Sequence, residues 1–96
     1  MAVIRISIEE VEAGAQLFHT KSQEIGDDVN TLQNAVDGFA EIWEGQAFQA
    51  FQNEFSILRK DIDKFVQLVD DIGTQLTSIK QAMIDADQDI ANQLGL

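Results

Sequence analysis

Few side chains in this 96-residue sequence could carry chemistry. It contains no cysteine, one histidine, His19, and serines at positions 7, 22, 56 and 78. A catalytic nucleophile needs an activating base in a pocket that excludes water, and no serine here lies in a nucleophile motif. His19 has no second imidazole or thiolate with which to bind a metal ion, and its place beside an apolar stripe is typical of a surface residue. We therefore expect no enzymatic activity and no cofactor.

The aspartates offer one apparent metal motif. Asp85, Asp87 and Asp89 have the spacing that opens a calcium loop, but Ile90 stands where that loop needs glycine. Leu96 stands where the loop needs a bidentate glutamate. We expect no metal site, and interpret the carboxylates as solvated helix faces.

The charge balance excludes several partners. The net charge of −11 disfavours nucleic acid, and it makes binding to an anionic membrane unfavourable at neutral pH. The amino-terminal "MAVIRISIEE" is too short an apolar run for a secretory signal, and no segment approaches the ~20 apolar residues that span a bilayer. These features predict a single domain, residues 1–96, that is synthesised in the cytoplasm without a cleavable signal peptide.

The elements that position these residues are two long helices. Ser7 and Glu10 have the spacing of a capping box, and Ile6 with Val11 could form the flanking apolar staple. From there apolar residues recur at alternating steps of three and four, with Ser22 as the one exception in the first helix. We predict a first helix over about 7–41, a turn over about 42–46 and a second helix over about 46–88. The residues of this heptad seam are Ile8, Val11, Ala15, Phe18, Ser22, Ile25, Val29, Leu32, Val36 and Phe39, then Phe48, Phe51, Phe55, Leu58, Ile62, Phe65, Val69, Ile72, Leu76, Ile79, Met83, Ala86 and Ile90.

The seam predicts an all-α, antiparallel two-helix hairpin with supercoiled packing. Two helices alone bury only the stripe between them, and this stripe is too wide for one neighbour. A second copy related by a two-fold axis would cover it and give an elongated four-helix bundle, although a different partner hairpin would satisfy the same geometry. The expected dimer interface consists of Ile62, Phe65, Val66, Leu68, Val69 and Ile72.

The turn holds Trp43, Glu44 and Gly45. Gly45 can adopt a positive φ, and Trp43 can cover the open end of the seam with a large apolar surface. Spacing alone favours a purely structural turn. However, Trp-Glu-Gly at the turn of a cysteine-free helical hairpin of this length resembles the WXG family of about one hundred residues, small proteins exported by type VII secretion. The resemblance covers the whole chain, and "WEGQAFQAFQNEF", "DKFVQLVDDIGTQL" and "NQLGL" are similar to its homodimeric Gram-positive branch.

The resemblance also implies an export signal in the tail, residues 83–96. The family's C-terminal pattern matches Met83, Asp87, Ile90 and Leu94, with methionine where many relatives have tyrosine. A helical tail of this kind offers apolar anchors and an orienting charge to a receptor groove. Without the resemblance, Met83 and Ile90 would simply complete the seam.

These observations favour a secreted or cell-surface, non-enzymatic homodimer. The resemblance implies recognition by the membrane ATPase of the secretion system, pairing with itself or a homologous WXG protein, and co-export of effectors in virulence or interbacterial interaction. One alternative is a cytosolic scaffold or chaperone that binds a partner helix. Another is a membrane-active effector, which the acidic surface opposes at neutral pH but less strongly at low pH.

Overall fold

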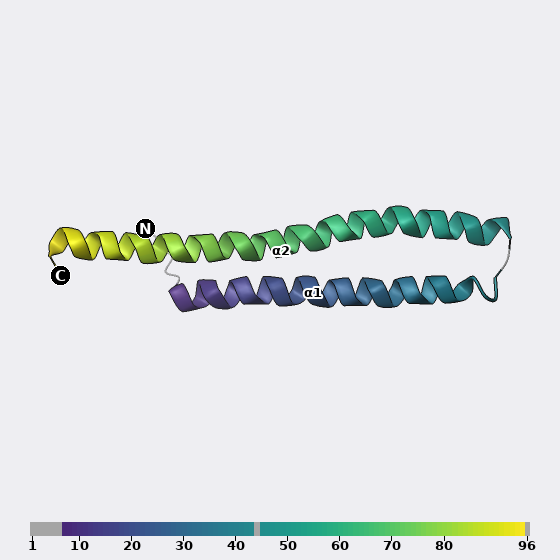
Figure 1. Ribbon diagram of the computed structural model, residues 1–96, viewed down its shortest axis with the longest axis horizontal. Coiled ribbons are helices and arrows are strands. Elements are labelled where there is room, and N and C mark those ends of the chain that lie inside the picture. The colour runs from purple at the N-terminus through teal and green to yellow at the C-terminus, as the bar shows by residue number, and fades with distance from the viewer. Residues whose placement is uncertain (1–6, 44, 96) are drawn as a thin grey trace, which may run out of the picture.

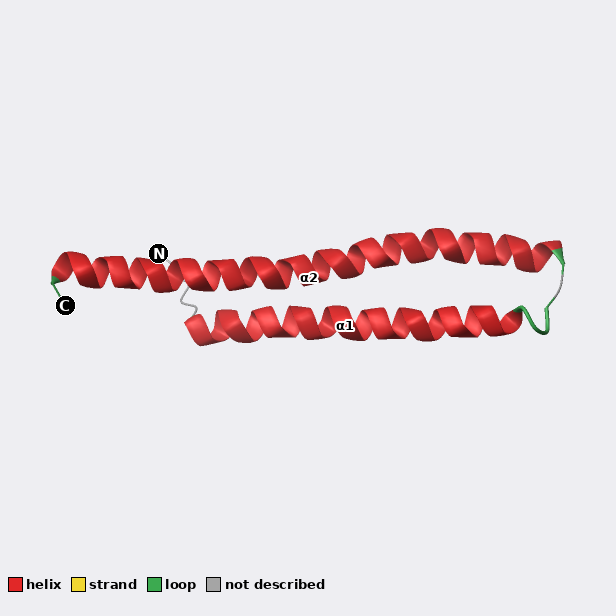
Figure 2. Cartoon of the chain, viewed as in Figure 1, coloured by secondary structure: helices red, strands yellow, loops and turns green. Residues whose placement is uncertain are grey.

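The protein is an antiparallel hairpin of two long helices (Figure 1). The computed structural model describes residues 7–43 and 45–95. Helix α1 spans Ile8–Phe39 and helix α2 spans Gln46–Leu94, and the molecule measures 75 × 23 × 21 Å. All other described residues form loops or turns (Figure 2). The predicted all-α hairpin is therefore confirmed for the described residues.

Helix α1 begins where its capping residue predicts. Ser7 has an extended backbone, with φ −85° and ψ 158°, and its Oγ accepts a hydrogen bond of 3.1 Å from the Glu10 amide. Glu9 and Glu10 place negative charge in the first turn, where it interacts favourably with the helix dipole. The predicted staple involves Ile6, which lies outside the described residues.

Two glycines with positive φ mark the limits of α2. Gly45, at φ 111° and ψ −176°, precedes the helix in a conformation that is almost confined to glycine. Gly95, at φ 74°, ends it in the left-handed conformation common after helices, and its N–H donates to the carbonyls of Ala91 and Asn92. Helix α2 therefore continues to Leu94, past the expected end near residue 88, while α1 stops at Phe39, slightly before the expected 41.

The core lies along one strip of each helix, and on α2 it includes the buried Gly73 as well as larger residues. On α1 every seventh residue from Ala15 is buried, together with Val11. On α2 Phe48 is buried, and the residues that follow it at seven-residue intervals are half-buried. The α1 line consists of Ala15, Ser22, Val29 and Val36, and the α2 line of Phe48, Phe55, Ile62, Val69, Leu76 and Met83.

Only one of the two apolar lines predicted for α2 packs against α1. The other line, defined here as the outer line, stays 38–56% exposed. A two-helix contact covers only a narrow strip of each helix. Helix α1 therefore contacts the α2 line that begins at Phe48, defined here as the inner line, and the line next to it on the side away from the outer line. The outer line consists of Phe51, Leu58, Phe65, Ile72 and Ile79, and the neighbouring line that faces α1 of Gln52, Arg59, Val66, Gly73 and Lys80.

Replacement of Gly73 with alanine tests this packing. A Cβ at Gly73 would lie 2.9 Å from His19 Nε2 and 3.0 Å from the Ala15 carbonyl oxygen, and the backbone atom cannot move aside. The clash costs about 1–3 kcal/mol, and the better helix propensity of alanine recovers up to about 1 kcal/mol. We expect Gly73→Ala to lower the free energy of unfolding by about 1 kcal/mol in urea denaturation followed by circular dichroism.

Gly38→Ala is the matched control, because a Cβ at Gly38 meets nothing within 4 Å. That variant should be as stable as the wild type or more so. Equal effects at the two positions would contradict the close approach of the helices at Gly73.

Candidate functional site

The hairpin has an apolar face that runs along both helices. On α2 it consists of the outer line, and on α1 of Phe18, Ile25, Leu32 and Phe39. Leu32 is 54% exposed and Phe39 40% exposed. The rings of Phe39 and Phe51 lie 6.5 Å apart, which brings the two halves of the face together near the turn. Water therefore covers a long strip of large apolar side chains on a single chain.

The residues expected at a dimer interface occupy different parts of this surface. Phe65, Leu68 and Ile72 are 56%, 60% and 40% exposed, and Phe65 and Ile72 belong to the apolar face. Ile62 and Val69 are half-buried in the inner line. Val66 is half-buried on the opposite side, where it lines a groove with residues of α1. The interface stays a prediction, now centred on Phe65 and Ile72.

The opposite side of the hairpin is a polar face with contacts between the helices. Near the start of α1, Lys80 Nζ lies 3.3 Å from Glu12 Oε1. Nearer the turn, the two terminal nitrogens of Arg59 donate to Asn30 Oδ1 at 2.6 Å and to Gln33 Oε1 at 3.3 Å. Because these contacts join the helices on this side, the outer line must lie on the other.

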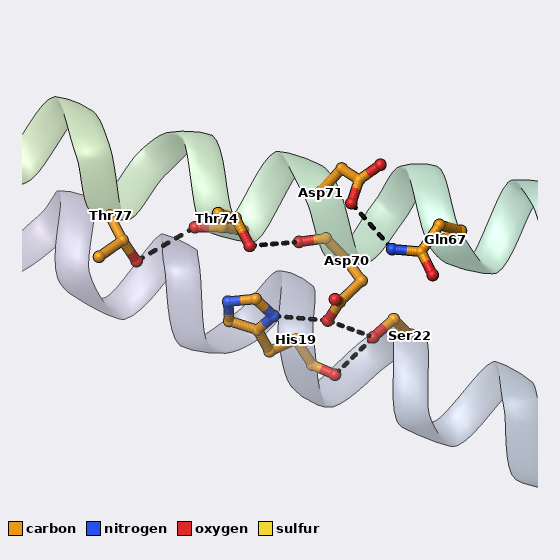
Figure 3. Close-up of polar contacts among 8 residues, drawn as sticks. His19, Ser22, Gln67, Asp70, Asp71, Thr74 and Thr77 are labelled. Carbon is orange, nitrogen blue, oxygen red and sulfur yellow. Dashed lines mark hydrogen bonds and ion pairs between the residues drawn. The ribbon is translucent and has the colours of Figure 1, made fainter.

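His19 and Asp70 form the central contact of the polar face (Figure 3). Their Nδ1 and Oδ1 atoms are 2.6 Å apart. Ser22 Oγ lies 2.8 Å from the His19 carbonyl oxygen, to which it donates, and 3.3 Å from Asp70 Oδ1. The hydrogen bond from His19 lowers the pKa of Asp70 below its ordinary 3.8. Desolvation of the carboxylate raises this pKa, whereas the charge of His19 and the hydrogen bond from Ser22 lower it further.

This trio is structural rather than catalytic. Ser22 Oγ is bonded to a carboxylate and a backbone carbonyl, so the imidazole is not placed to take its proton. The Nε2 atom of His19 lies 2.9 Å from the position that a Cβ at Gly73 would take. His19 lies at the surface as expected, with 39% of its side chain exposed, and Gly73 leaves room for the ring. Two residues in the sequence could have indicated this contact between the helices: Ser22, the one polar residue of the seam in α1, and Gly73 in α2.

The turn is closed by aromatic packing. The Trp43 ring stacks on Phe51 at 5.8 Å between ring centroids and lies 5.4 Å from the ring of Phe48. The backbone N–H of Trp43 donates to the Phe39 carbonyl at 2.8 Å. Trp43 remains 41% exposed, so it covers the end of the core and also presents surface to solvent. Glu44 lies outside the described residues.

The tail extends past the start of α1 (Figure 1). Helix α1 has 32 residues and α2 has 49, so their lengths are roughly 48 and 74 Å. Met83 is half-buried, whereas Asp87 is exposed and Ile90 and Leu94 are 56% and 67% exposed. These residues follow one side of the helix, and the last three have no α1 beside them. Their role in export stays a prediction.

Two further features concern the described residues only. Among residues 7–43 and 45–95, no group of three or more histidine and carboxylate side chains could hold a metal ion. Neither α1 nor α2 combines the length and apolar character needed to cross a bilayer.

Comparison with known proteins agrees with this geometry. Residues 3–88 match the model of WXG100, described as proteins of 100 residues with WXG. The chain belongs to the WXG100 family. This WXG100 protein is 38% identical over 96 residues to the type VII secretion system extracellular protein A of Staphylococcus aureus strain USA300, covering 100% of this chain and 99% of the relative.

Solved structures show the same fold. Geobacillus thermodenitrificans EsxA superposes with a TM-score of 0.82 at 28% identity, over 95% of this chain and 98% of that one. The secreted protein EsxB of Bacillus anthracis strain Sterne gives 0.81 at 25% identity, over 91% and 99%. The protein is thus an EsxA-like, non-enzymatic WXG100 protein of type VII secretion with an extracellular destination, as the sequence predicted.

The His19–Asp70 contact predicts a pH dependence of stability for this WXG100 protein. Because the folded-state pKa of Asp70 is depressed, its contribution is present above the ordinary pKa of 3.8 and is lost as the pH falls through the lower folded-state value. In urea unfolding between pH 2 and 7, we expect the stability difference between wild type and Asp70→Asn to be largest above pH ~4.5 and to shrink below it.

Asp71→Asn is the control, because it removes the same charge from the next residue, which bonds to Gln67 on its own helix. If the two variants showed the same profile, general charge repulsion rather than the contact with His19 would explain the effect.

Proposed function

We propose that the protein is a homodimeric substrate of a type VII secretion system, exported folded and read through its C-terminal tail. The observation that carries the proposal is the overhang of α2, where Asp87, Ile90 and Leu94 are exposed on a part of the helix that lies past the start of α1. An exposed stripe of two apolar anchors and one charge suits a receptor groove. The receptor in this proposal is the membrane ATPase of the secretion system.

The apolar face supports the dimer. Its outer-line residues are each 38–56% exposed in a single chain, and covering each would contribute on the order of 1 kcal/mol. A second hairpin related by a two-fold axis presents the same face in return and completes a four-helix bundle. In an antiparallel bundle, Trp43 and Gly45 of one hairpin lie toward the tail of the other, so turn and tail can form one recognition surface.

Co-export of effectors follows from the same arrangement. A dimer that carries two exposed tails and two turns offers surfaces to other exported proteins as well as to the ATPase. In this proposal the protein acts as an adaptor in virulence or interbacterial interaction, and a homologous WXG hairpin is the alternative occupant of the apolar face.

A charge in the apolar face tests the dimer. We expect Phe65→Glu and Ile72→Glu each to weaken self-association at least about tenfold, because an unpaired carboxylate would be buried at the interface. Sedimentation equilibrium over a range of concentrations measures the effect. Ile57→Glu is the control, since Ile57 is 65% exposed but lies outside both lines of α2.

Retention of the dimer in the Phe65 and Ile72 variants would contradict this interface. A wild-type chain that is monomeric alone but pairs with a homologous WXG protein would identify the heterodimer as the true assembly.

The tail is tested by export from the native bacterium. A chain ending at Ala82 keeps the outer line through Ile79 and should still dimerise, but we expect it to stay in the cells because it lacks the whole export pattern. Asp87→Asn should reduce export of the full-length chain severalfold, whereas Asp89→Asn, two residues away and equally exposed, should not. Immunoblots of medium and cells, with a cytosolic protein as lysis marker, measure the fractions.

Efficient export of the truncated dimer would show that the tail is not the signal. If no chain, intact or truncated, left the cells while the apparatus exported other substrates, the cytosolic scaffold would be the better account.

A further inference from the structure

The polar face contains a groove that the proposed dimer leaves open. It has a volume of about 490 Å³ and lies between the His19–Asp70 contact and the Arg59–Asn30 contact. Its lining consists of Ser22, Gln23, Gly26, Asp27, Asn30, Val66, Gln67 and Asp70. Because these residues are on the side opposite the apolar face, pairing of two hairpins does not cover them.

Gly26 lines the groove, and the packing of the hairpin does not require a glycine at this position. It lies in the middle of α1, where glycine is unfavourable for a helix, yet a Cβ there would meet nothing within 4 Å. Gly73 differs, since a Cβ there would collide with His19 and the Ala15 carbonyl. Glycine at position 26 instead keeps the groove open to close approach by another molecule.

The chemistry of the lining selects a cation. Asp27 and Asp70 contribute carboxylates, and Gln23 and Gln67 contribute amides, whereas Asn30 Oδ1 already accepts from Arg59 at the edge of the groove. No lysine or arginine is among the lining residues. Asp27 forms no ion pair with the other described residues, whereas Asp70 is bonded to His19. Carboxylate and amide oxygens grouped in this way accept hydrogen bonds from guanidinium or ammonium groups.

We propose that this groove docks a basic helix of a partner protein, with an arginine or lysine side chain over Gly26 between Asp27 and Asp70. A groove between two helices fits a third helix, and the small residues Ser22 and Gly26 allow the backbone of that helix to come close. The chain's net charge of −11 adds attraction over a longer range. This surface is separate from the apolar face and the tail, so the proposal goes beyond export.

The probe is a blocked, alanine-rich helical peptide with arginines at i, i+4 and i+7, titrated into the ¹⁵N-labelled full-length protein. We expect amide shift changes concentrated at Ser22, Gly26, Asp27, Val66 and Asp70, and weaker binding as salt is raised. The same peptide with glutamines in place of the arginines should not bind.

Three variants locate the binding. Gly26→Leu fills the groove and should weaken binding about tenfold or more, and Asp27→Asn should weaken it severalfold. Asp28→Asn, the matched control, removes an equal charge that does not line the groove and should leave affinity within about twofold.

Gly26→Ala should raise the melting temperature of the hairpin by a few degrees, because alanine favours the helix and meets no clash.

Several results would overturn the proposal. Absence of binding, equal losses in Asp27→Asn and Asp28→Asn, or full affinity in Gly26→Leu would show only general attraction between opposite charges. A lower melting temperature for Gly26→Ala would mean that the hairpin itself needs the glycine. Association of dimers that is lost in Gly26→Leu would identify a second copy, not a basic partner helix, as the occupant.

Discussion

The close packing of one strip of α1 against one strip of α2 is the constraint from which the other features follow. Ala15 lies beside Gly73, where a Cβ would come within 3.0 Å of the Ala15 carbonyl oxygen, and Ser22 bonds to Asp70, so the two helices approach closely along this strip. Only one strip of each helix can take part in such a contact. The second apolar line of α2 is consequently turned outward, and a chain with a regular heptad repeat acquires one apolar and one polar face.

The polar face sets the alignment of the helices more than it stabilises them. The contacts of Lys80 with Glu12 and of Arg59 with Asn30 and Gln33 are partly exposed, and exposed polar contacts of this kind contribute little to stability. Their value lies in position, because a shift of one helix along the other would separate every partner. The His19–Asp70 contact is the most specific of them, because the His19 ring needs the space at Gly73 and Ser22 bonds to the same carboxylate. Together these contacts fix which part of α2 extends past α1.

In the proposed function, the overhang and the two faces serve different partners. The apolar face suits another hairpin, the tail suits a receptor, and the polar groove stays accessible beside both. The protein is a hairpin of 96 residues whose polar groove is open at the surface, and the proposed recognition therefore takes place on helix surfaces. The family relationship establishes the setting in secretion, and the exposure of particular side chains supports the proposed partners.

The sequence by itself determined both helices, the capping of α1 by Ser7, the turn at Trp43 and Gly45, and the family, because these depend on local periodicity and on residues close together in the chain. It also indicated that apolar surface would exceed what one hairpin buries. Only the tertiary structure decided which apolar line faces inward, that Val66 lies beside the polar groove, and that His19 meets Asp70 across 51 positions. The physical reason is that a heptad repeat marks a stripe without stating which edge of it meets the neighbouring helix. That choice depends on contacts between distant residues, here on the space at Gly73 and on polar partners that line up only when the helices are antiparallel.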